Sequence, residues 1–70
     1  MTRGTINYFN RDKGFGFIST DEIPVESIFM HFSALTDQDW KLDIAKGDRV
    51  QFNTIRTARG LQATDIRQID

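Results

Sequence analysis

The stretch KGFGFI at residues 13–18 decides the fold, because a strand there has phenylalanines on one face and glycines on the other. In a β-strand, successive side chains point to opposite faces. Phe15 and Phe17 therefore share one face, whereas the other face offers Ile18 as its one large apolar side chain. Which face is buried then depends on the strand that pairs with this stretch.

The stretch IFMHF at residues 28–32 predicts that partner strand. Ile28 and Met30 share one face, and Phe29 and His31 share the other. If Ile18 joins the two aliphatic residues in the core, the outer face carries Phe15, Phe17, Phe29 and His31. The reverse parity would bury His31 and expose three aliphatic side chains together, so the first arrangement is the expected one.

Three phenylalanines on one exposed face form a patch that suggests a use. Each exposed ring forgoes about 1.5–3 kcal/mol of burial, and small monomers rarely carry such a patch without a function. Bases of single-stranded nucleic acid stack on such rings, at about 1–3 kcal/mol per base. A protein partner is the alternative, since aromatic residues are also enriched at protein interfaces. Lys13 and His31 among the rings favour phosphate and base edges, because the centre of a protein interface is depleted in charge.

The composition predicts one small domain spanning residues 1–70, without a cofactor. The sequence has 70 residues, no cysteine and one histidine, so neither a disulfide nor a cysteine or histidine metal cluster is expected. No N-terminal apolar run resembles a signal peptide, and no apolar stretch approaches the ~20 residues of a membrane span. We therefore expect a cytoplasmic protein. Separately, we expect a monomer.

The charge balance argues against a polycation that binds duplexes through phosphates alone. The chain has nine Lys and Arg residues, ten Asp and Glu residues and a net charge of −1. Local distribution matters more than this sum, and Lys13 and Arg59 are the cations expected at phosphates. Because His31 is the one histidine, no nucleophile–base pair is indicated, and the chain is not expected to be an enzyme.

The hydrophobic pattern along the chain predicts an all-β fold. Strands are expected at residues 4–10, 15–19, 27–31, 49–55 and 61–68, with one helical turn at 32–35. Turn residues separate these stretches, and no long amphipathic helix is present. Five short strands of this kind indicate a small antiparallel five-stranded barrel.

Some positions within these strands constrain the packing further. In the first strand, strict alternation does not separate apolar from polar residues, and a twist or a bulge near Tyr8 would resolve this. Phe52 alternates with polar neighbours and is expected in the core, whereas Phe9 is expected to be partly buried. In the last strand, Ala63 and Ile66 are both core candidates, which requires a break in parity between them.

Several motifs together resemble the bacterial cold-shock domain. They are NYFN at residues 7–10, KGFGFI at 13–18, IFMHFSA at 28–34 and RGLQA at 59–63, and they span nearly the whole chain in order. The resemblance implies a five-stranded OB-type barrel that binds single-stranded RNA and DNA, preferentially pyrimidine-rich. It also implies an RNA chaperone or a regulator of transcription and translation in cold or stress adaptation.

The resemblance also implies which residues bind. The stacking residues of the family fall on Tyr8, Phe15, Phe17, Phe29, His31, Phe32 and Trp40. Its polar contacts fall on Lys13, Arg59 and Gln62. Trp40 lies in the connection before the fourth strand, where it could instead cover the end of the barrel.

This sequence departs from the usual family pattern at several positions. Asn7 and Tyr8 stand where lysine and tryptophan are usual, which removes a cation and reduces a stacking face. Ser27 replaces a common aspartate, Trp40 replaces a phenylalanine and Leu61 replaces a proline. These differences bear on affinity and base preference and leave the mode of binding unchanged.

Overall fold

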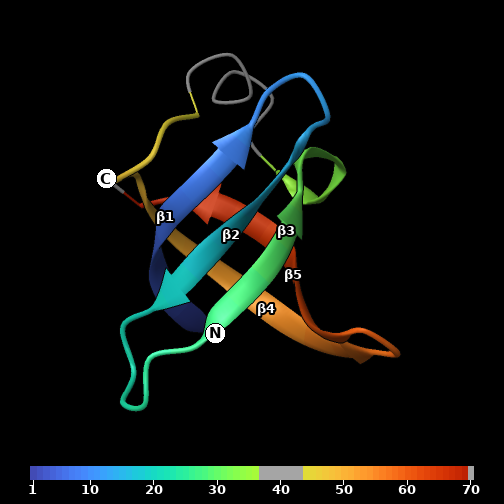
Figure 1. The fold of residues 1–70 in the computed structure, drawn as a ribbon. Coiled ribbons are helices and arrows are strands. Elements are labelled where there is room, and N and C mark those ends of the chain that lie inside the picture. The colour runs from blue at the N-terminus through green and yellow to red at the C-terminus, as the bar shows by residue number, and fades with distance from the viewer. Residues whose placement is uncertain (37–43, 70) are drawn as a thin grey trace.

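The chain folds into a closed barrel of five short strands (Figure 1). The structure is a computed structural model, which describes residues 1–36 and 44–69. Around the barrel the strands follow the order β1-β2-β3-β5-β4. The elements are β1 (Thr2–Asn10), β2 (Phe15–Thr20), β3 (Ser27–His31), the 3₁₀ turn η1 (Phe32–Ala34), β4 (Arg49–Thr57) and β5 (Gly60–Gln68). The predicted all-β fold is confirmed.

The core lies inside the barrel and has the parity that the sequence predicts. Ile18, Ile28 and Met30 are buried, and they share the interior with Phe52, which is 0% exposed. The other buried apolar side chains among the described residues are Ile6, Leu35, Ile44, Val50, Ala63 and Ile66. Because these side chains fill the interior, the alternate residues of β2 and β3 face outward.

A bulge in β1 turns Tyr8 outward. Ile6 pairs with Ile18. Tyr8, two residues further along β1, pairs with Phe17, which is only one residue away from Ile18 in the antiparallel strand β2. Asn7 is therefore the extra residue in the strand, and its insertion changes the alternation. The irregularity expected near Tyr8 is thus confirmed.

Phe9 follows the bulge and faces inward. It is half-buried and packs against the core, as predicted. The break in β5 is also confirmed: Asp65 has a φ of 50°, and both Ala63 and Ile66 are buried. Aspartate is one of the residues that tolerate this backbone conformation.

Four strands are longer than the sequence pattern indicates, and β2 gains only Thr20. β1 begins at Thr2, because its first residues pair with β4. β4 continues to Thr57 and β5 begins at Gly60, so the loop expected at residues 56–60 is reduced to a tight hairpin turn. The Thr57 hydroxyl holds this turn: it donates to the Gly60 carbonyl at 2.8 Å and accepts from the Arg59 N–H at 3.2 Å.

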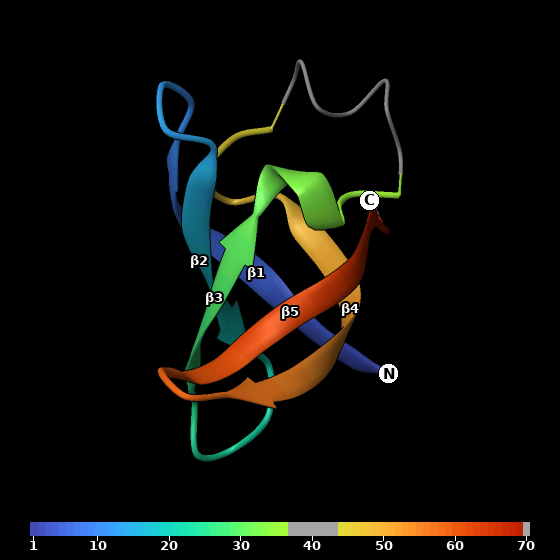
Figure 2. The same cartoon turned by 90° about the vertical axis from the view of Figure 1, so that its right-hand side faces the viewer.

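The barrel closes where β3 meets β5 (Figure 2). The two strands run parallel, with Phe29 paired to Gln62, so the sheet is not antiparallel throughout as the sequence reading proposed. All other strand pairs in the described residues are antiparallel. In the same residues, no helix is long and apolar enough to cross a membrane.

Candidate nucleic-acid interface

Four aromatic rings lie together on the outside of three neighbouring strands. Tyr8 of β1, Phe15 and Phe17 of β2, and Phe29 of β3 form what we call the aromatic platform. Phe15 and Phe29 are stacked, with centroids 6.1 Å apart, and Phe17 meets Phe29 edge-on at 5.9 Å. Tyr8 lies 6.3 Å from Phe15 and 6.4 Å from Phe17. The outward parity predicted for β2 and β3 is therefore what brings these rings together.

The rings of the platform cover one another's edges. Tyr8 is 45% exposed and Phe17 36%, whereas Phe15 and Phe29 are half-buried. Aromatic pairs at such distances contribute about 0.5–1.5 kcal/mol beyond the area that they bury. This mutual contact offsets part of the cost of leaving the rings outside, and it holds them as one surface.

A second aromatic pair continues the surface beyond the end of β3. The rings of His31 and Phe32 have centroids 4.8 Å apart. Phe32 packs directly on Gly14, where a Cβ atom would lie 2.3 Å from the ring, and its N–H donates to the Gly14 carbonyl at 2.8 Å. Gly14 also has a φ of 73°, which favours glycine. The lack of a side chain at Gly14 therefore leaves the space that the ring of Phe32 occupies.

Ser33 fixes the hydrogen-bonding state of His31. The Ser33 N–H donates to Nδ1 of the imidazole at 3.2 Å, and the Ser33 hydroxyl lies 2.8 Å from the same nitrogen. A nitrogen that accepts a backbone N–H carries no proton of its own, so the neutral ring is protonated at Nε2. His31 therefore offers both a ring face and an Nε2–H donor.

Asn10 organises the turn that carries Lys13. Its carbonyl accepts from the Gly14 N–H at 2.7 Å, and its side-chain oxygen accepts from the Lys13 N–H at 3.1 Å. Its amide also donates to the Tyr8 hydroxyl at 3.3 Å. Asn10 pairs with Phe15 across the strands, so the exposed Lys13 is held at the edge of the platform.

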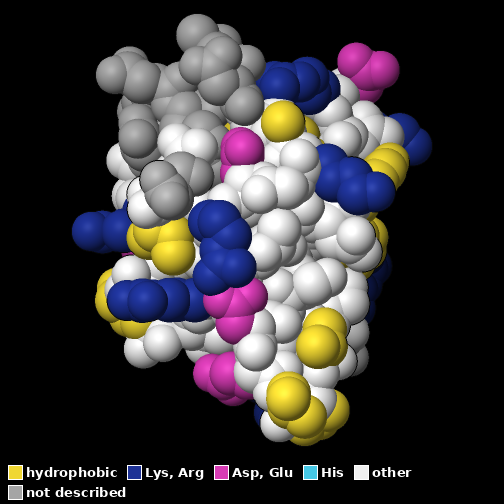
Figure 3. Space-filling view, turned by 90° about the vertical axis from the view of Figure 1, so that its left-hand side faces the viewer, with side chains coloured by type: hydrophobic (Ala, Val, Ile, Leu, Met, Phe, Trp, Pro, Cys, Tyr) yellow, Lys and Arg dark blue, Asp and Glu magenta, His cyan; other side chains and the backbone are white. Residues whose placement is uncertain are grey.

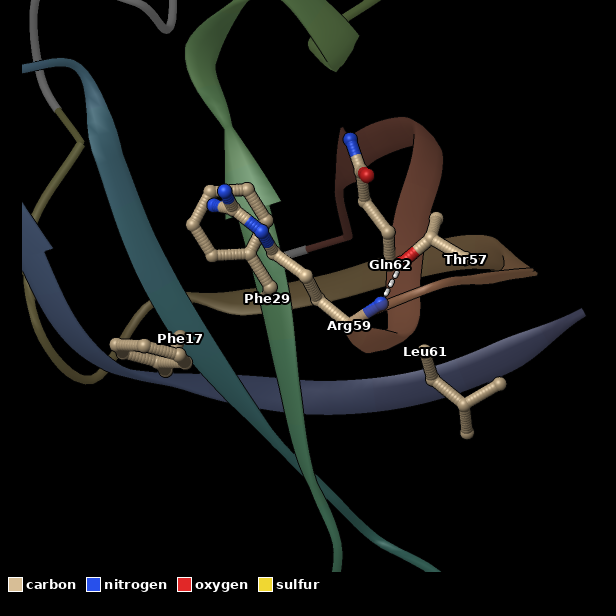
Figure 4. Close-up of a pocket in the computed structure, with 6 residues that line it drawn as sticks. All are labelled: Phe17, Phe29, Thr57, Arg59, Leu61 and Gln62. Carbon is tan, nitrogen blue, oxygen red and sulfur yellow. Dashed lines mark hydrogen bonds between the residues drawn. The ribbon is translucent and has the colours of Figure 1, made fainter.

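A pocket of about 340 Å³ lies between the platform and the β4–β5 hairpin (Figure 4). In Figure 4 the Arg59 side chain extends from the hairpin toward the rings, and Gln62 stands beside it. The lining of this pocket combines two aromatic rings with a guanidinium and an amide, which suits a base and a nearby phosphate. The pocket is lined by Phe17, Phe29, Thr57, Arg59, Leu61 and Gln62.

The structure thus brings most of the predicted site residues onto one continuous surface. Trp40 lies outside the described residues. Ser33 and Thr57 were not predicted, although the spacing of Ser33 from His31 is one at which a serine can hydrogen-bond a nearby residue. Among the described residues, no group of three or more His, Cys, Asp or Glu side chains is placed to hold a metal ion. The predicted residues on this surface are Tyr8, Lys13, Phe15, Phe17, Phe29, His31, Phe32, Arg59 and Gln62.

Curated relatives resemble this chain along almost its whole length. It is 39% identical to the major cold shock protein of Streptococcus pyogenes over 69 residues, covering 99% of this chain and 98% of that protein. It is 36% identical to the major cold shock protein of Micrococcus luteus, with 99% and 100% covered. It is 37% identical to cold shock protein CspC of Bacillus subtilis, with 97% and 98% covered.

A solved structure and a family model agree with these relatives. The chain superimposes on Drosophila Unr CSD456 with a TM-score of 0.80 at 30% identity, covering 99% of this chain and 26% of that one. The model of the 'Cold-shock' DNA-binding domain matches residues 2–69. The resemblance seen in the sequence is thereby confirmed: the chain belongs to the cold-shock domain family, a family of nucleic-acid-binding domains.

Proposed function

We propose that this protein binds single-stranded RNA and DNA by stacking bases on the aromatic platform, with a preference for pyrimidine-rich strands. It acts as a monomer in the cytoplasm, as an RNA chaperone or as a regulator of transcription or translation in cold or stress adaptation. It binds and does not catalyse. His31 and Phe32 extend the stacking surface, and Lys13, Arg59 and Gln62 supply polar contacts. Trp40, outside the described residues, is expected from the family resemblance to stack on a base as well.

The observation that supports this proposal is the set of four outward rings in mutual contact, with centroid distances between 5.9 and 6.4 Å. Bases within a duplex already stack on each other, so their faces are not available to such a surface. An unpaired strand can place one base after another on the rings. Lys13 at the edge and Arg59 in the pocket stand where the backbone of that strand would pass.

Replacing the rings singly tests the proposal. Phe15→Ala, Phe17→Ala and Phe29→Ala are each expected to weaken binding of a short oligothymidine by about 1–3 kcal/mol, because each removes a stacking face. Fluorescence anisotropy of a labelled strand measures the affinity, and thermal denaturation checks the fold. Ile23→Ala is the matched control, since Ile23 is 95% exposed in the β2–β3 loop, away from the platform.

The ring variants also distinguish this proposal from a protein-interaction module. Binding that is the same for all three variants and the parent would show that stacking on the platform is wrong. A parent protein that binds no single strand at all would favour the protein partner instead. A hairpin-free strand and its duplex, titrated side by side, separate base stacking from phosphate binding.

The proposed chaperone activity makes a second prediction. The sequence has no phosphate-binding loop with the Walker spacing, so the protein can only trap strands that open spontaneously, which shifts the equilibrium by mass action. Melting of weak RNA hairpins is therefore expected to need stoichiometric protein and no ATP. A quenched fluorophore pair at the hairpin ends reports opening. Opening by catalytic amounts of protein, and only with ATP, would contradict this mechanism.

A further inference from the structure

A row of polar side chains crosses β1, β4 and β5, on a face of the barrel different from the one that carries the aromatic platform. Arg3 of β1 pairs with Gln51 of β4, and Gln51 pairs in turn with Arg67 of β5. Gln51 lies between the buried residues Val50 and Phe52, so its side chain points outward. Residues directly opposite in a sheet share a face, so both arginines point outward beside it.

Arg49 adds a third cation to this face. It lies two residues before Gln51 on β4, which gives it the same parity, and it pairs across the strands with Thr5. Its guanidinium forms an ion pair with Asp21 and donates to the Thr5 hydroxyl at 3.4 Å. We call Arg3, Arg49 and Arg67 the arginine cluster. Figure 3 shows Lys and Arg side chains on this face, with Asp and Glu side chains beside some of them.

The arginine cluster concentrates positive charge in a chain whose net charge is −1. Arg3 and Arg67 are two strand spacings apart, about 10 Å. Within residues 1–36 and 44–69, the structure records an ion pair for Arg49 and none for Arg3 or Arg67. Like charges gathered on one face repel each other, and an anion between them would remove that repulsion. The planar guanidinium suits phosphate oxygens in particular.

β1 connects the arginine cluster to the aromatic platform. Its outward residues run from Arg3 through Thr5 and Asn7 to Tyr8, a length of about 16 Å at 3.3 Å per residue. Thr5 pairs with Ser19 of β2, so small polar side chains lie between the two surfaces. An OB-type barrel can contact about 4–16 nucleotides, so a strand longer than the platform can reach the cluster.

We propose that the arginine cluster binds backbone phosphates of the same single strand whose bases stack on the aromatic platform. This inference rests on the proposed function, which it extends from the platform around β1. The cluster adds affinity only for strands long enough to span both surfaces. It carries no base specificity, because phosphate contacts carry no sequence information.

The experiment compares oligothymidines of about 4 and about 20 nucleotides, the first at the lower end of the ~4–16 nucleotides that such a barrel contacts and the second beyond the upper end. In the double variant Arg3→Gln/Arg67→Gln, affinity for the longer strand is expected to fall about tenfold at ~0.15 M salt. Its slope of log K against log salt should become about 1.4 less steep, at about 0.7 per lost phosphate contact. The shorter strand is expected to bind as it does to the parent, because charges about 16 Å away are screened beyond the ~8 Å Debye length.

Two further variants make the result decisive. Arg3→Lys/Arg67→Lys keeps both charges and is expected to retain most of the affinity for the longer strand, while thermal denaturation confirms that each variant is folded. Phe29→Ala should weaken both lengths. If Phe29→Ala weakens both but the glutamine variant binds the longer strand like the parent, the arginine proposal is wrong and the platform stands. An equal loss at both lengths would also overturn it, and no effect of Phe29→Ala would overturn the proposed function itself.

Discussion

Gly16→Ala is expected to destabilise the protein by about 3 kcal/mol, the upper end of the usual cost of overpacking. An added Cβ would lie 2.1 Å from the Tyr8 carbonyl oxygen and 2.9 Å from the Cα of Phe9. Both atoms belong to the backbone of β1, so relief requires the strand pair itself to separate. A domain of this size rarely holds more than about 3–5 kcal/mol, so most of the variant's stability should be lost. Urea denaturation followed by circular dichroism measures the change.

Gly60→Ala provides the matched control for this substitution. Gly60 has a φ of 119°, which an alanine adopts with strain, but nothing lies within 4 Å of the position of its Cβ atom. The two variants therefore separate a steric clash from backbone strain, and Gly16→Ala is expected to be the more costly. A Gly16→Ala protein as stable as the parent would mean that β1 and β2 do not approach as closely as described.

Phe52→Ala is expected to lower the free energy of unfolding by about 3–5 kcal/mol, because it empties a fully buried site. Phe52 is 0% exposed at the centre of the barrel. The loss is comparable to the whole stability of the domain, so this variant should be largely unfolded in the absence of denaturant. Chemical denaturation of the parent and the variant measures the difference.

Phe17→Ala is the control that separates the loss of a buried phenylalanine from the loss of an exposed one. Both residues are phenylalanines in strands, but Phe17 is 36% exposed on the platform. Its replacement should reduce stability much less than Phe52→Ala does and should reduce binding of single strands instead. Equal destabilisation by the two variants would contradict the outward parity of β2.

The side chains of β2 and β3 could be assigned to core and surface from the sequence because alternation is a local property. Ile18 and Met30 could be placed inside, and Phe17 and Phe29 outside, once residues 28–32 were taken as the strand that pairs with residues 13–18. The position of the β1 bulge could not be derived in this way. Which residue is extra depends on the partner strand, here on Tyr8 pairing with Phe17.

Contacts between distant strands were the part of the site that residue patterns alone did not predict. Gln62 lies near Phe29 because β5 closes the barrel against β3; its role was expected from the family resemblance. The arginine cluster depends on the register of β4 against both neighbours, which places Arg3 and Arg67 on either side of Gln51. Ser33 was missed for another reason: its N–H donates to Nδ1 of His31 and so selects the tautomer of that ring, which side-chain alternation does not reveal.

The bulge in β1 has a consequence for changes in chain length. Asn7 has no partner of its own in the ladder with β2. Loss of Asn7 would leave Tyr8 directly after Ile6, still opposite Phe17 and still facing outward. Loss of one residue between Thr2 and Ile6 would instead reverse every side chain on one side of the deletion, because the period of a strand is two residues. Position 7 is therefore the place in β1 where evolution can remove a residue and keep both outer surfaces.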